Sequence, residues 1–349
     1  MEMASGNSLM NPVVSICIAN YNGIDLIDAC IESVRAQDCD FPFEIIVHDD
    51  ASADGSAAHI RSRHPDAKLI KSTENVGFCV ANNRMAAIAQ GTYLLLLNND
   101  AELEPGALSA LHAEASRLDC PAILTLPQFA LDSGELVDRG CLLDPFFNPI
   151  PNLDPGRADV AMVIGACLWI PTTLWRELGG FPDWFGSIAE DMYLCCRARL
   201  AGHPVQVVDR SGYRHRVGCS FGGGKVVANA LATTSRRRAL SERNKTYVIF
   251  LVYPPLPLAV LLPLHILMLQ LEGLLLSLLK QNPAIYATIY GPLLPALWRE
   301  RRRLIQLRHQ VQATRVISFA TFQQPMRWTL RKVQMLLQYG LPQVRGTGA

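Results

Sequence analysis

The sequence lacks the short motifs of several large nucleotide-binding and metal-binding classes. No G-x-G-x-x-G pattern follows the first apolar segment, which argues against a dinucleotide-binding domain. Gly222 to Lys225 resembles part of a P-loop, but the upstream glycine at the required spacing and the Ser or Thr after the lysine are missing. The ten cysteines contain no C-x-x-C pair, so we expect reduced, buried thiols rather than a zinc site.

An excess of one charge is also missing. The chain has 32 Lys and Arg against 31 Asp and Glu, a net charge of +1, which gives no reason to expect a nucleic-acid partner. Residues 1–12 form a polar tail without the basic and apolar regions of a secretory signal peptide, so the domain that follows is expected in the cytoplasm. The length of 349 residues allows one large or two ordinary domains.

Short apolar segments alternate with helical patterns from residue 13 onward. The four leucines at 94–97, entered from Gly91 and left through Asn98, Asn99 and Asp100, predict a strand that is buried on both faces. Further strands are predicted at 13–19, 44–48, 68–71, 165–170 and 205–208, and helices at 25–36, 56–64, 78–89, 171–178 and 192–201. This alternation predicts an α/β fold with a mostly parallel sheet and flanking helices.

Polar clusters follow three of the predicted strands, at 20–23, 49–56 and 98–100. In an open α/β sheet the carboxyl ends of the strands form the ligand-binding edge, so these clusters are expected to converge there. Asp100 at that edge suits a hard cation such as Mg²⁺ or Mn²⁺, and such an ion suits a diphosphate. The alternative is that Asn98, Asn99 and Asp100 form a turn with a helix cap.

A second block contains three further candidates. Residues 179–186 form a loop rich in glycine and aromatic residues, Glu190 and Asp191 open a helix, and His215 follows a strand. Acidic residues at a helix start are also ordinary capping residues, and a lone histidine is more often structural than a ligand.

Taken together, these pieces resemble the family 2 glycosyltransferases with the GT-A fold, and among them the bacterial rhamnosyltransferase-like and galactofuranosyltransferase-like members. The resemblance covers residues 13–220 and rests on the order and spacing of the pieces rather than on any one of them. The matching segments are residues 14–22, 44–56, 74–78, 82–83, 97–100, 179–181, 190–191 with Arg197 and Gly202, and 215–220.

The resemblance implies a role for each matching residue. A nucleotide-sugar donor is expected at Asn20, Asn22, Asp49, Asp50, Asn75, Gly77, Asn82, Asn98 and Asn99. A divalent metal, Mn²⁺ or Mg²⁺, is expected on Asp100 and His215, and an acceptor loop at Gly180, Phe181 and Trp184. Asp191 is expected to be the catalytic base, positioned by Glu190. The sequence departs from the family at Asn98, where the first Asp of the D-x-D motif is replaced, so weaker metal binding is expected.

The implied reaction is a single inverting displacement that moves a sugar to a lipid-linked or polysaccharide acceptor in cell-surface glycan synthesis. dTDP-rhamnose or a UDP-sugar is the expected donor. The alternative from another functional class is a catalytically inactive, membrane-anchored binding or assembly subunit with the same fold. The joint presence of Asp49, Asp50, Asp100, Asp191 and His215 argues against that alternative. A sugar-1-phosphate nucleotidyltransferase is disfavoured, because no glycine-rich basic loop follows the first strand.

The C-terminal third is both apolar and basic. An uncharged stretch from Tyr247 to Gln270 is long enough to span a membrane, but Pro254, Pro255, Pro257 and Pro263 are expected to interrupt it. Basic residues on both sides predict that both ends lie in the cytoplasm, so the segment either dips into the membrane and returns or lies in its surface. Residues 316–339 have the composition of a basic interfacial helix.

We therefore expect a GT-A catalytic domain at 13–235 and a membrane-associating helical region at 236–349. The protein is expected at the cytoplasmic face of the plasma membrane, as a peripheral or monotopic protein. Alternatively, the apolar helices pack on the catalytic domain or on another subunit, which allows an oligomer.

Overall fold

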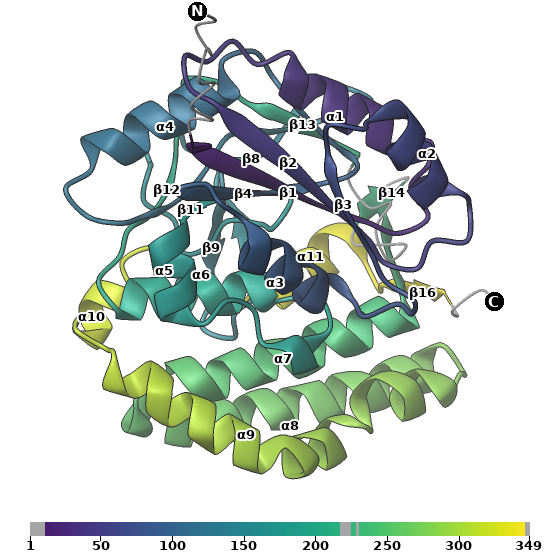
Figure 1. Cartoon of the computed structure of the whole chain (residues 1–349). Coiled ribbons are helices and arrows are strands. Elements are labelled where there is room, and N and C mark those ends of the chain that lie inside the picture. Colours follow the sequence, from purple (N-terminus) through teal and green to yellow (C-terminus); the bar gives the residue numbers. More distant parts are fainter. Residues whose placement is uncertain (1–10, 217–224, 228–229, 346–349) are drawn as a thin grey trace, which may run out of the picture.

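A mixed seven-stranded sheet forms the centre of the computed structural model, which describes residues 11–216, 225–227 and 230–345. The strand order is β12-β6-β11-β4-β1-β2-β3 (Figure 1). The strands are β1 (Val14–Asn20), β2 (Phe43–Asp49), β3 (Lys68–Lys71), β4 (Tyr93–Asn98), β6 (Ile123–Thr125), β11 (Cys167–Pro171) and β12 (Val205–Val207). Only β11 runs antiparallel to its neighbours, so the expected mostly parallel sheet is confirmed.

Helices cover both faces of this sheet, because its central strand is apolar on both sides. Leu95 and Leu97 of β4 pack into one cluster with α1 (Ile27–Arg35), α2 (Ser56–Arg63) and α4 (Ala107–Arg117). Leu94 and Leu96 pack on the other face with α3 (Phe78–Ile88), α5 (Thr172–Leu178) and α6 (Glu190–Leu200). The predicted strands and helices of this part are thus confirmed, with boundaries that differ by at most two residues.

Short strands beside the central sheet bring distant residues together. The strands β5 (Ala101–Leu103), β13 (Tyr213–His215), β7 (Gln128–Ala130) and β8 (Leu136–Asp138) form a second sheet, in the order β5-β13-β7-β8. A hairpin joins β9 (Cys141–Leu143) to β10 (Pro149–Pro151), and β14 (Lys225–Val227), β15 (Ala230–Thr234) and β16 (Gln343–Arg345) form a third sheet. Because His215 of β13 pairs with Ala101 of β5, the histidine is placed beside Asp100.

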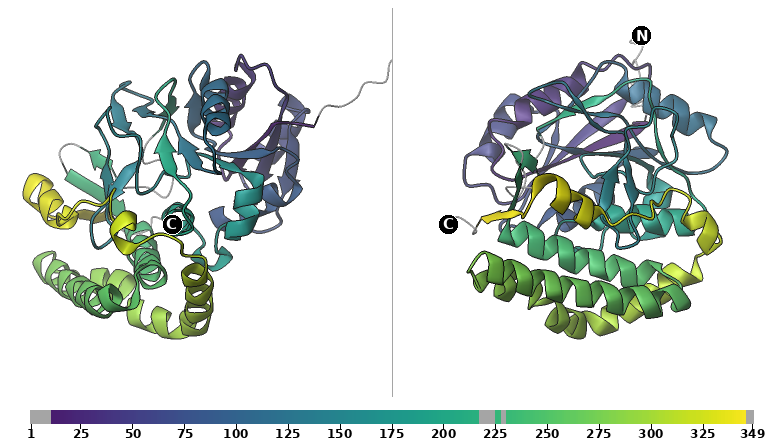
Figure 2. Two further views of the ribbon diagram at one scale, coloured as in Figure 1. Left: turned by 90° about the vertical axis from the view of Figure 1, so that its left-hand side faces the viewer. Right: turned by 180° about the vertical axis from the view of Figure 1, so that it is seen from behind.

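The C-terminal helices differ in their relation to the core. Helix α7 (Ser235–Val252) packs against α6, and its residues 247–252, apart from the partly buried Phe250, are buried in the same apolar cluster. Helices α8 (Pro255–Leu279) and α9 (Leu293–Ala313) lie farther from the sheet, at the end of the molecule opposite α1 and α2 (Figures 1 and 2). The apolar residues of α7 therefore serve the α/β core. The assignment of 236–349 to membrane association stays a prediction, and exposed apolar side chains in that region lie on α8 and also on α9 and α11 (Arg331–Tyr339).

Two sequence-based expectations about the C-terminal region are wrong in detail. Pro263 lies inside α8 and does not end it, whereas Pro254 and Pro255 do separate α7 from α8. The basic helix expected at 316–339 is replaced by two short helices, α10 (Phe319–Phe322) and α11 (Arg331–Tyr339). Pro325 lies between them, and proline removes a helical hydrogen bond and clashes with the preceding turn.

By length and composition, α8 alone among the helices of the described chain could cross a membrane. Its 25 residues have a mean hydropathy of 1.9 over the most apolar window, and only 17% of that window is buried in the protein. A buried core helix can pass the same length and composition test, but α8 differs from such a helix in being mostly exposed.

Two leucines on either side of the α7–α8 break test whether α7 belongs to the folded core. Leu251 is 0% exposed and Leu256 is 84% exposed. Leu251→Ala is expected to lower the free energy of unfolding by about 2–5 kcal/mol, because it leaves a cavity. Leu256→Ala is expected to change it by less than about 0.5 kcal/mol. Urea unfolding followed by circular dichroism measures both, and equal effects would contradict the assignment of α7 to the core.

Candidate functional site

The loops after β1, β2 and β4 are joined to one another by hydrogen bonds between side chains. The Asn20 amide donates to Asp49 Oδ1 (3.1 Å), and the Asn99 amide donates to Asn20 Oδ1 (2.8 Å). Asp49 also accepts from the Ser52 N–H (3.2 Å) and is fully buried. Three predicted donor residues thus converge at one edge of the sheet, as the sequence suggests. Asp49 holds the loops together there, and its role toward a nucleotide stays a prediction.

Asp50 links this edge to the start of α3. Its two carboxylate oxygens accept from the N–H groups of Val76 (2.7 Å) and Gly77 (2.9 Å). Gly77 has a φ of 86°, and a Cβ added there would lie 3.1 Å from the Gly186 carbonyl oxygen, so the position requires glycine. The contact holds two predicted regions together, since residue 77 belongs to the proposed donor loop and residue 186 ends the proposed acceptor loop.

The other predicted donor residues differ in where their side chains lie. Asn22 has a φ of 49°, and its side chain accepts from the Ala53 N–H (2.8 Å), so it shapes the same edge. Asn75 is exposed beside Gly77. Asn82 is buried, and its amide donates to the Phe78 carbonyl in its own helix (2.9 Å), so the structure does not bring it to the edge.

Asp100 and His215 form the group with the best fit to a metal ion. The Asp100 Oδ1 and His215 Nε2 atoms are 3.0 Å apart, and the Asn98 amide lies 3.5 Å from the same nitrogen. Neighbouring ligands of an octahedral ion, each about 2.1 Å from it, are about 3.0 Å apart. His215 Nδ1 is buried without a hydrogen-bond partner among the described residues. Carboxylate oxygen and imidazole nitrogen are both accepted by Mn²⁺. Residues 217–220 of the segment that matches the family lie outside the described residues.

A second group of metal-binding side chains does not fit an ion. Asp28, His59 and His64 have ligand atoms within 4.8 Å of one another, and both histidine Nε2 atoms contact Asp28 Oδ1 at 2.7–2.8 Å. The Arg35 guanidinium donates to His64 Nδ1 (2.8 Å), so the proton of a neutral His64 lies on Nε2 and points at Asp28. Ligation through Nε2 would put that proton on Nδ1, facing a donor. The group is therefore a hydrogen-bonded cluster between α1 and α2.

Glu190 and Asp191 are adjacent carboxyl groups at the start of α6; Glu190 is buried and Asp191 is partly exposed. Burial, followed by the charge of Asp191, raises the pKa of Glu190 to about 8. Burial also raises the pKa of Asp191, but the N–H groups of Gly165 (3.1 Å) and Met192 (2.7 Å) act to lower it. The charge of Arg237 in α7 lowers the pKa of both carboxyls. At neutral pH the raised pKa keeps Glu190 protonated, whereas the N–H groups of Gly165 and Met192 favour the ionised form of Asp191.

The residues before β11 connect the carboxyl pair to the end of β4. The Gly165 N–H donates to Asp191, and the next residue, Ala166, accepts from the Asn98 N–H (3.1 Å). A continuous path thus runs from Asp191 to Asn98 and then to Asp100. The structure therefore brings together the predicted base and the predicted metal ligands, which are far apart in the sequence.

The backbone just before Glu190 is strained. Ile188 and Ala189 have φ values of 70° and 67°, which are rare for residues with a Cβ and exceptional for a β-branched residue. Asn244 of α7 holds this turn, because its fully buried amide lies within hydrogen-bond distance of the carbonyls of Phe185 (3.1 Å), Ser187 (2.9 Å) and Ile188 (2.7 Å). Asn244 is not among the residues predicted from the sequence, because it stands between Arg243 and Lys245 in a polar stretch that does not set it apart.

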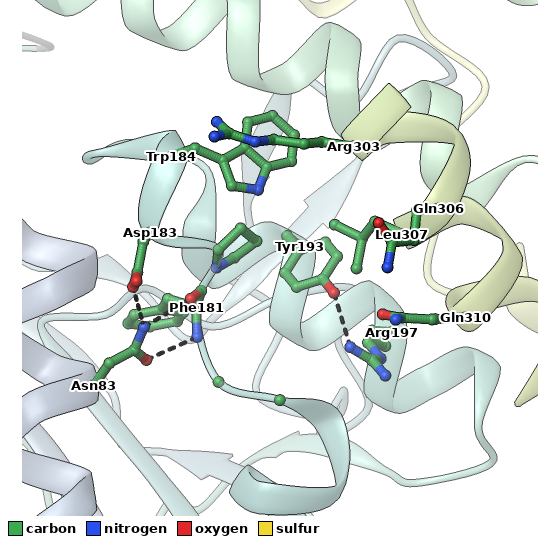
Figure 3. A pocket seen from close by; sticks show the side chains of 13 residues that line it. Asn83, Phe181, Asp183, Trp184, Tyr193, Arg197, Arg303, Gln306, Leu307 and Gln310 are labelled. Carbon is green, nitrogen blue, oxygen red and sulfur yellow. Dashed lines mark hydrogen bonds between the residues drawn. The ribbon is translucent and has the colours of Figure 1, made fainter. Parts of the chain in front are cut away.

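The predicted acceptor loop is held on its outer side by α3. Asn83 donates to the Phe181 carbonyl (2.8 Å) and accepts from the Phe181 N–H (3.1 Å), as Figure 3 shows. Gly180 has a φ of 63°, and a Cβ there would lie 2.6 Å from Asn83 Oδ1. Asn83, which is not among the predicted site residues, therefore helps to hold this loop against α3.

A hollow of about 480 Å³ lies between the acceptor loop and α9. Trp184 and Tyr193 line it together with Arg303 and Gln306 of α9 (Figure 3). The predicted acceptor loop thus faces the C-terminal helices, whereas the predicted donor residues lie at the edge of the sheet. The structure does not bring Trp184 to that edge.

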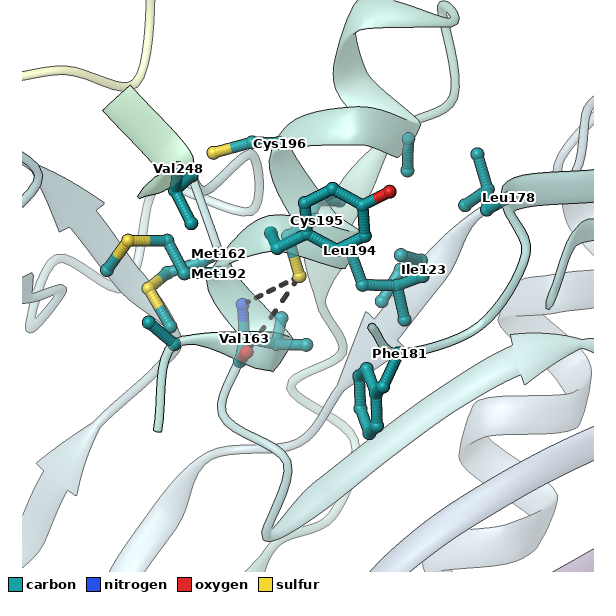
Figure 4. Close-up of a cluster of buried hydrophobic side chains, with 14 of the residues drawn as sticks. Ile123, Met162, Val163, Leu178, Phe181, Met192, Leu194, Cys195, Cys196 and Val248 are labelled. Atoms are coloured by element: carbon teal, nitrogen blue, oxygen red, sulfur yellow. Dashed lines mark hydrogen bonds between the residues drawn. The ribbon is translucent and has the colours of Figure 1, made fainter. Parts of the chain in front are cut away.

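An apolar layer under α6 fixes the position of the carboxyl pair. Every residue of α6 except Asp191 is buried, and Leu194 and Cys195 are completely so. The Val163 N–H lies 3.5 Å from the Cys195 sulfur, and Val248 of α7 packs in the same cluster (Figure 4). Helix α6 is therefore a rigid support, which is what a positioned carboxyl pair requires.

Glu190 makes stability depend on pH. Its pKa lies near 4.5 in an unfolded chain and at about 8 in the fold, so between these values the folded protein keeps a proton that the unfolded chain has released. Stability therefore falls as pH rises through this window. Glu190→Gln is expected to reduce the loss between pH 5.5 and 8 by on the order of 2 kcal/mol, measured by urea unfolding. The exposed Glu135→Gln serves as the control, and an unchanged loss in Glu190→Gln would contradict the raised pKa.

Asn244→Ala tests the support of the strained turn. The change is expected to cost about 1–3 kcal/mol, because buried carbonyls lose their donor, and to speed hydrogen–deuterium exchange across residues 185–189. Asn152→Ala is the matched control, since Asn152 is also buried and its amide donates to the Arg139 and Arg157 carbonyls elsewhere. If both variants leave exchange at 185–189 unchanged, Asn244 does not support the turn.

Comparison with known proteins agrees with this arrangement. Residues 15–135 match the family model described as Glycosyl transferase family 2. A protein of Sinorhizobium fredii of uncharacterized function is 27% identical over 248 residues, which are 66% of this chain and 25% of that protein. The N-acetylglucosaminyl-diphospho-decaprenol L-rhamnosyltransferase of Mycobacterium tuberculosis is 25% identical over 193 residues, 46% of this chain and 62% of that protein. The chain thus spans less than two thirds of either curated relative.

Solved structures share the fold. The crystal structure of GalNAc-T7 with UDP, GalNAc and Mn²⁺ matches with a TM-score of 0.62 at 15% identity, covering 96% of this chain and 59% of that one. The family match at residues 15–135 includes the loops that carry Asn20, Asp49, Asp50 and Asp100. Residues 15–135 are thus similar to glycosyl transferase family 2, and the sheet and helices of the chain have the GT-A fold.

Proposed function

We propose that this protein is an inverting glycosyltransferase. It moves a sugar from a nucleotide-diphosphate sugar, dTDP-rhamnose or a UDP-sugar, to a hydroxyl group of a lipid-linked or polysaccharide acceptor in cell-surface glycan synthesis. The family match and the rhamnosyltransferase relative support this assignment. The observation that carries it is the adjacent carboxyl pair Glu190 and Asp191, connected through residues 165 and 166 to Asp100 and His215.

Asp191 is the proposed base. The ionised carboxylate takes the proton of the acceptor hydroxyl while the acceptor oxygen attacks the anomeric carbon, and the bond from that carbon to the diphosphate oxygen breaks. Glu190 stays protonated at neutral pH, because its pKa is raised to about 8, so the charge needed for proton abstraction is concentrated on Asp191. Asn244 acts as a positioning residue, since it holds the turn that leads into the pair.

Asp100 and His215 are the proposed metal ligands. When bound, Mn²⁺ or Mg²⁺ neutralises the negative charge of the departing diphosphate. Asn98 can offer only a neutral amide oxygen beside them, so we expect this chain to hold the ion less tightly than a chain with an Asp at that position. Asp50 and Asn22 shape the neighbouring edge, where the nucleotide is proposed to bind.

The acceptor is proposed to reach the site from the side of the C-terminal helices. The loop with Gly180, Phe181 and Trp184 faces the hollow beside α9, and Arg303 there suits an anionic group. We propose that the protein works at the cytoplasmic face of the plasma membrane, as a peripheral or monotopic protein. Holding the site near a lipid-linked acceptor raises the effective concentration of that acceptor.

A donor screen tests the proposed reaction. UDP-, dTDP- and GDP-sugars are incubated with Mn²⁺ or Mg²⁺, and release of the nucleoside diphosphate is followed with and without lipid-linked acceptor. Asp191→Asn is expected to lower turnover of the accepted donor by about 10²–10⁴-fold, because the base is lost. Asp100→Ala is expected to lower it and to weaken the metal dependence.

The exposed Asp132→Asn is the matched control and is expected to keep the activity of the unaltered protein. If no donor is turned over under any of these conditions, the inactive binding or assembly subunit is the better assignment.

A further inference from the structure

Helix α8 presents one completely apolar face to the surroundings. Thirteen of its residues are exposed, and none of them is polar or charged. They recur every three or four positions, so they form a single stripe along the helix. The stripe consists of Pro255, Leu256, Ala259, Val260, Pro263, Leu264, Leu267, Met268, Leu271, Leu274, Leu275, Leu278 and Leu279.

The opposite face of α8 carries all of the polar side chains of the helix, and each of them bonds to the rest of the protein. His265 Nε2 lies 2.9 Å from the Thr246 hydroxyl of α7, and Glu272 accepts from Lys332 (2.7 Å). Gln270 accepts from the Tyr286 hydroxyl (2.7 Å), and the Ser277 hydroxyl accepts from the Tyr286 N–H (2.9 Å). This inner face, here called the polar seam, combines these polar contacts with the buried Leu269 and Leu276, so it packs on the protein and is not a second lipid-facing surface.

Charged residues fasten α8 to the catalytic unit. Lys332 of α11 contacts Glu272 of α8 and Glu242 of α7, each at 2.7 Å, and Arg238 of α7 also pairs with Glu272. Lys245 pairs with Glu242 (2.9 Å) on the buried side. Moving α8 away from α7 would leave these partly buried charges without their partners, which is strongly unfavourable.

The sequence around α8 is strongly basic. Residues 253–349 contain eleven Lys and Arg and only two Glu, whereas residues 1–252 contain 21 Lys and Arg against 29 Asp and Glu. Trp298 of α9 and Trp328 before α11 are each 69% exposed, and the Arg301 guanidinium lies 4.1 Å from the Trp298 ring centre. Exposed tryptophan beside arginine is typical of side chains that sit at the headgroup level of a bilayer.

We propose that α8 lies in the plane of an anionic phospholipid surface and does not cross it. The apolar stripe enters the boundary between headgroups and acyl chains, and the polar seam stays on the protein. With 25 residues, α8 is about 37 Å long, so its length alone would allow a crossing. A crossing helix would carry Glu272, His265 and Gln270 into hydrocarbon without their present partners, which is costly.

An anionic bilayer fits the stripe better than a second copy of this chain does. Two copies meeting through this region would bring two surfaces of the same positive sign together, whereas anionic headgroups complement it. This inference deepens the membrane-surface part of the proposed function and does not need the transfer reaction to be correct.

Vesicle flotation tests the binding without any donor present. The full-length protein is mixed with vesicles of phosphatidylcholine alone or with added phosphatidylglycerol. The unaltered protein is expected to float with the anionic vesicles and to be released by salt. Leu271→Glu combined with Leu278→Glu is expected to lower the bound fraction at least about tenfold, because charge enters the stripe. Leu153→Glu, at a leucine 58% exposed outside the stripe, is the matched control and is expected to bind normally.

A labelling experiment separates a helix in the surface from one that crosses. Lys280→Cys, at the end of α8, is made together with Cys120→Ser, which removes the one thiol that is exposed among the described residues, and with Cys219→Ser, because residue 219 lies outside them. A membrane-impermeant maleimide added outside the vesicles is expected to label position 280 in the vesicle-bound protein without any detergent. Labelling only after detergent opens the vesicles would mean that α8 crosses, and would overturn the proposal.

Two other results would also overturn it. One is a failure of the unaltered protein to bind anionic vesicles. The other is a protein that ignores vesicles but is a dimer by light scattering and becomes a monomer in the Leu271→Glu, Leu278→Glu variant, since the stripe would then be an interface between copies. Donor turnover, measured separately in solution, reports on the transfer reaction and not on this surface.

Discussion

Strand β4 must be covered on both sides, and the rest of the structure follows from that requirement. Leu94 and Leu96 face one apolar cluster, and Leu95 and Leu97 face the other. Neither face can meet water, so helices have to pack on each side, and the chain achieves this by alternating strands with helices. The strand ends at Asn98, and Asp100 follows in the next turn. At this point the two apolar clusters end, and polar side chains from three loops lie close together. Burial of four leucines thus determines where chemistry is possible.

The candidate site also depends on a helix that lies outside the family match. Residues 15–135 carry the donor edge and Asp100, but the carboxyl pair at the start of α6 needs the α7 residues Asn244 and Arg237. Helix α7 supplies hydrogen bonds to a turn with two unfavourable backbone conformations, and it places a positive charge near the carboxyl pair. The C-terminal region is therefore a working part of the α/β unit, although its amino-acid composition suggests a separate function.

Local sequence patterns predict the order of strands and helices well, because apolar periodicity and turn residues are local properties. They also predict that Asn20, Asp49 and Asp100 converge, since strand ends of a parallel sheet share an edge. They fail where tertiary contacts decide. Nothing local distinguishes Asn82, which bonds within its own helix, from Asn83, which holds the acceptor loop. Likewise, the apolar residues 247–252 are predicted from the sequence to belong to a membrane segment. The break at Pro254 and Pro255 separates α7 from α8, so these residues of α7 pack in the core.

The uneven distribution of charge makes the molecule an electric dipole. The first 252 residues have an excess of acidic groups and the remaining residues an excess of basic groups, although the chain as a whole is nearly neutral. A nearly neutral protein of this kind is attracted only weakly to an anionic surface at long range. The surface nevertheless exerts a torque on the dipole, which rotates the basic end toward the surface. The torque acts within about 8–10 Å at physiological salt, which is the range over which charges are unscreened. Ionic strength would therefore govern how often an encounter with the surface begins in the right orientation.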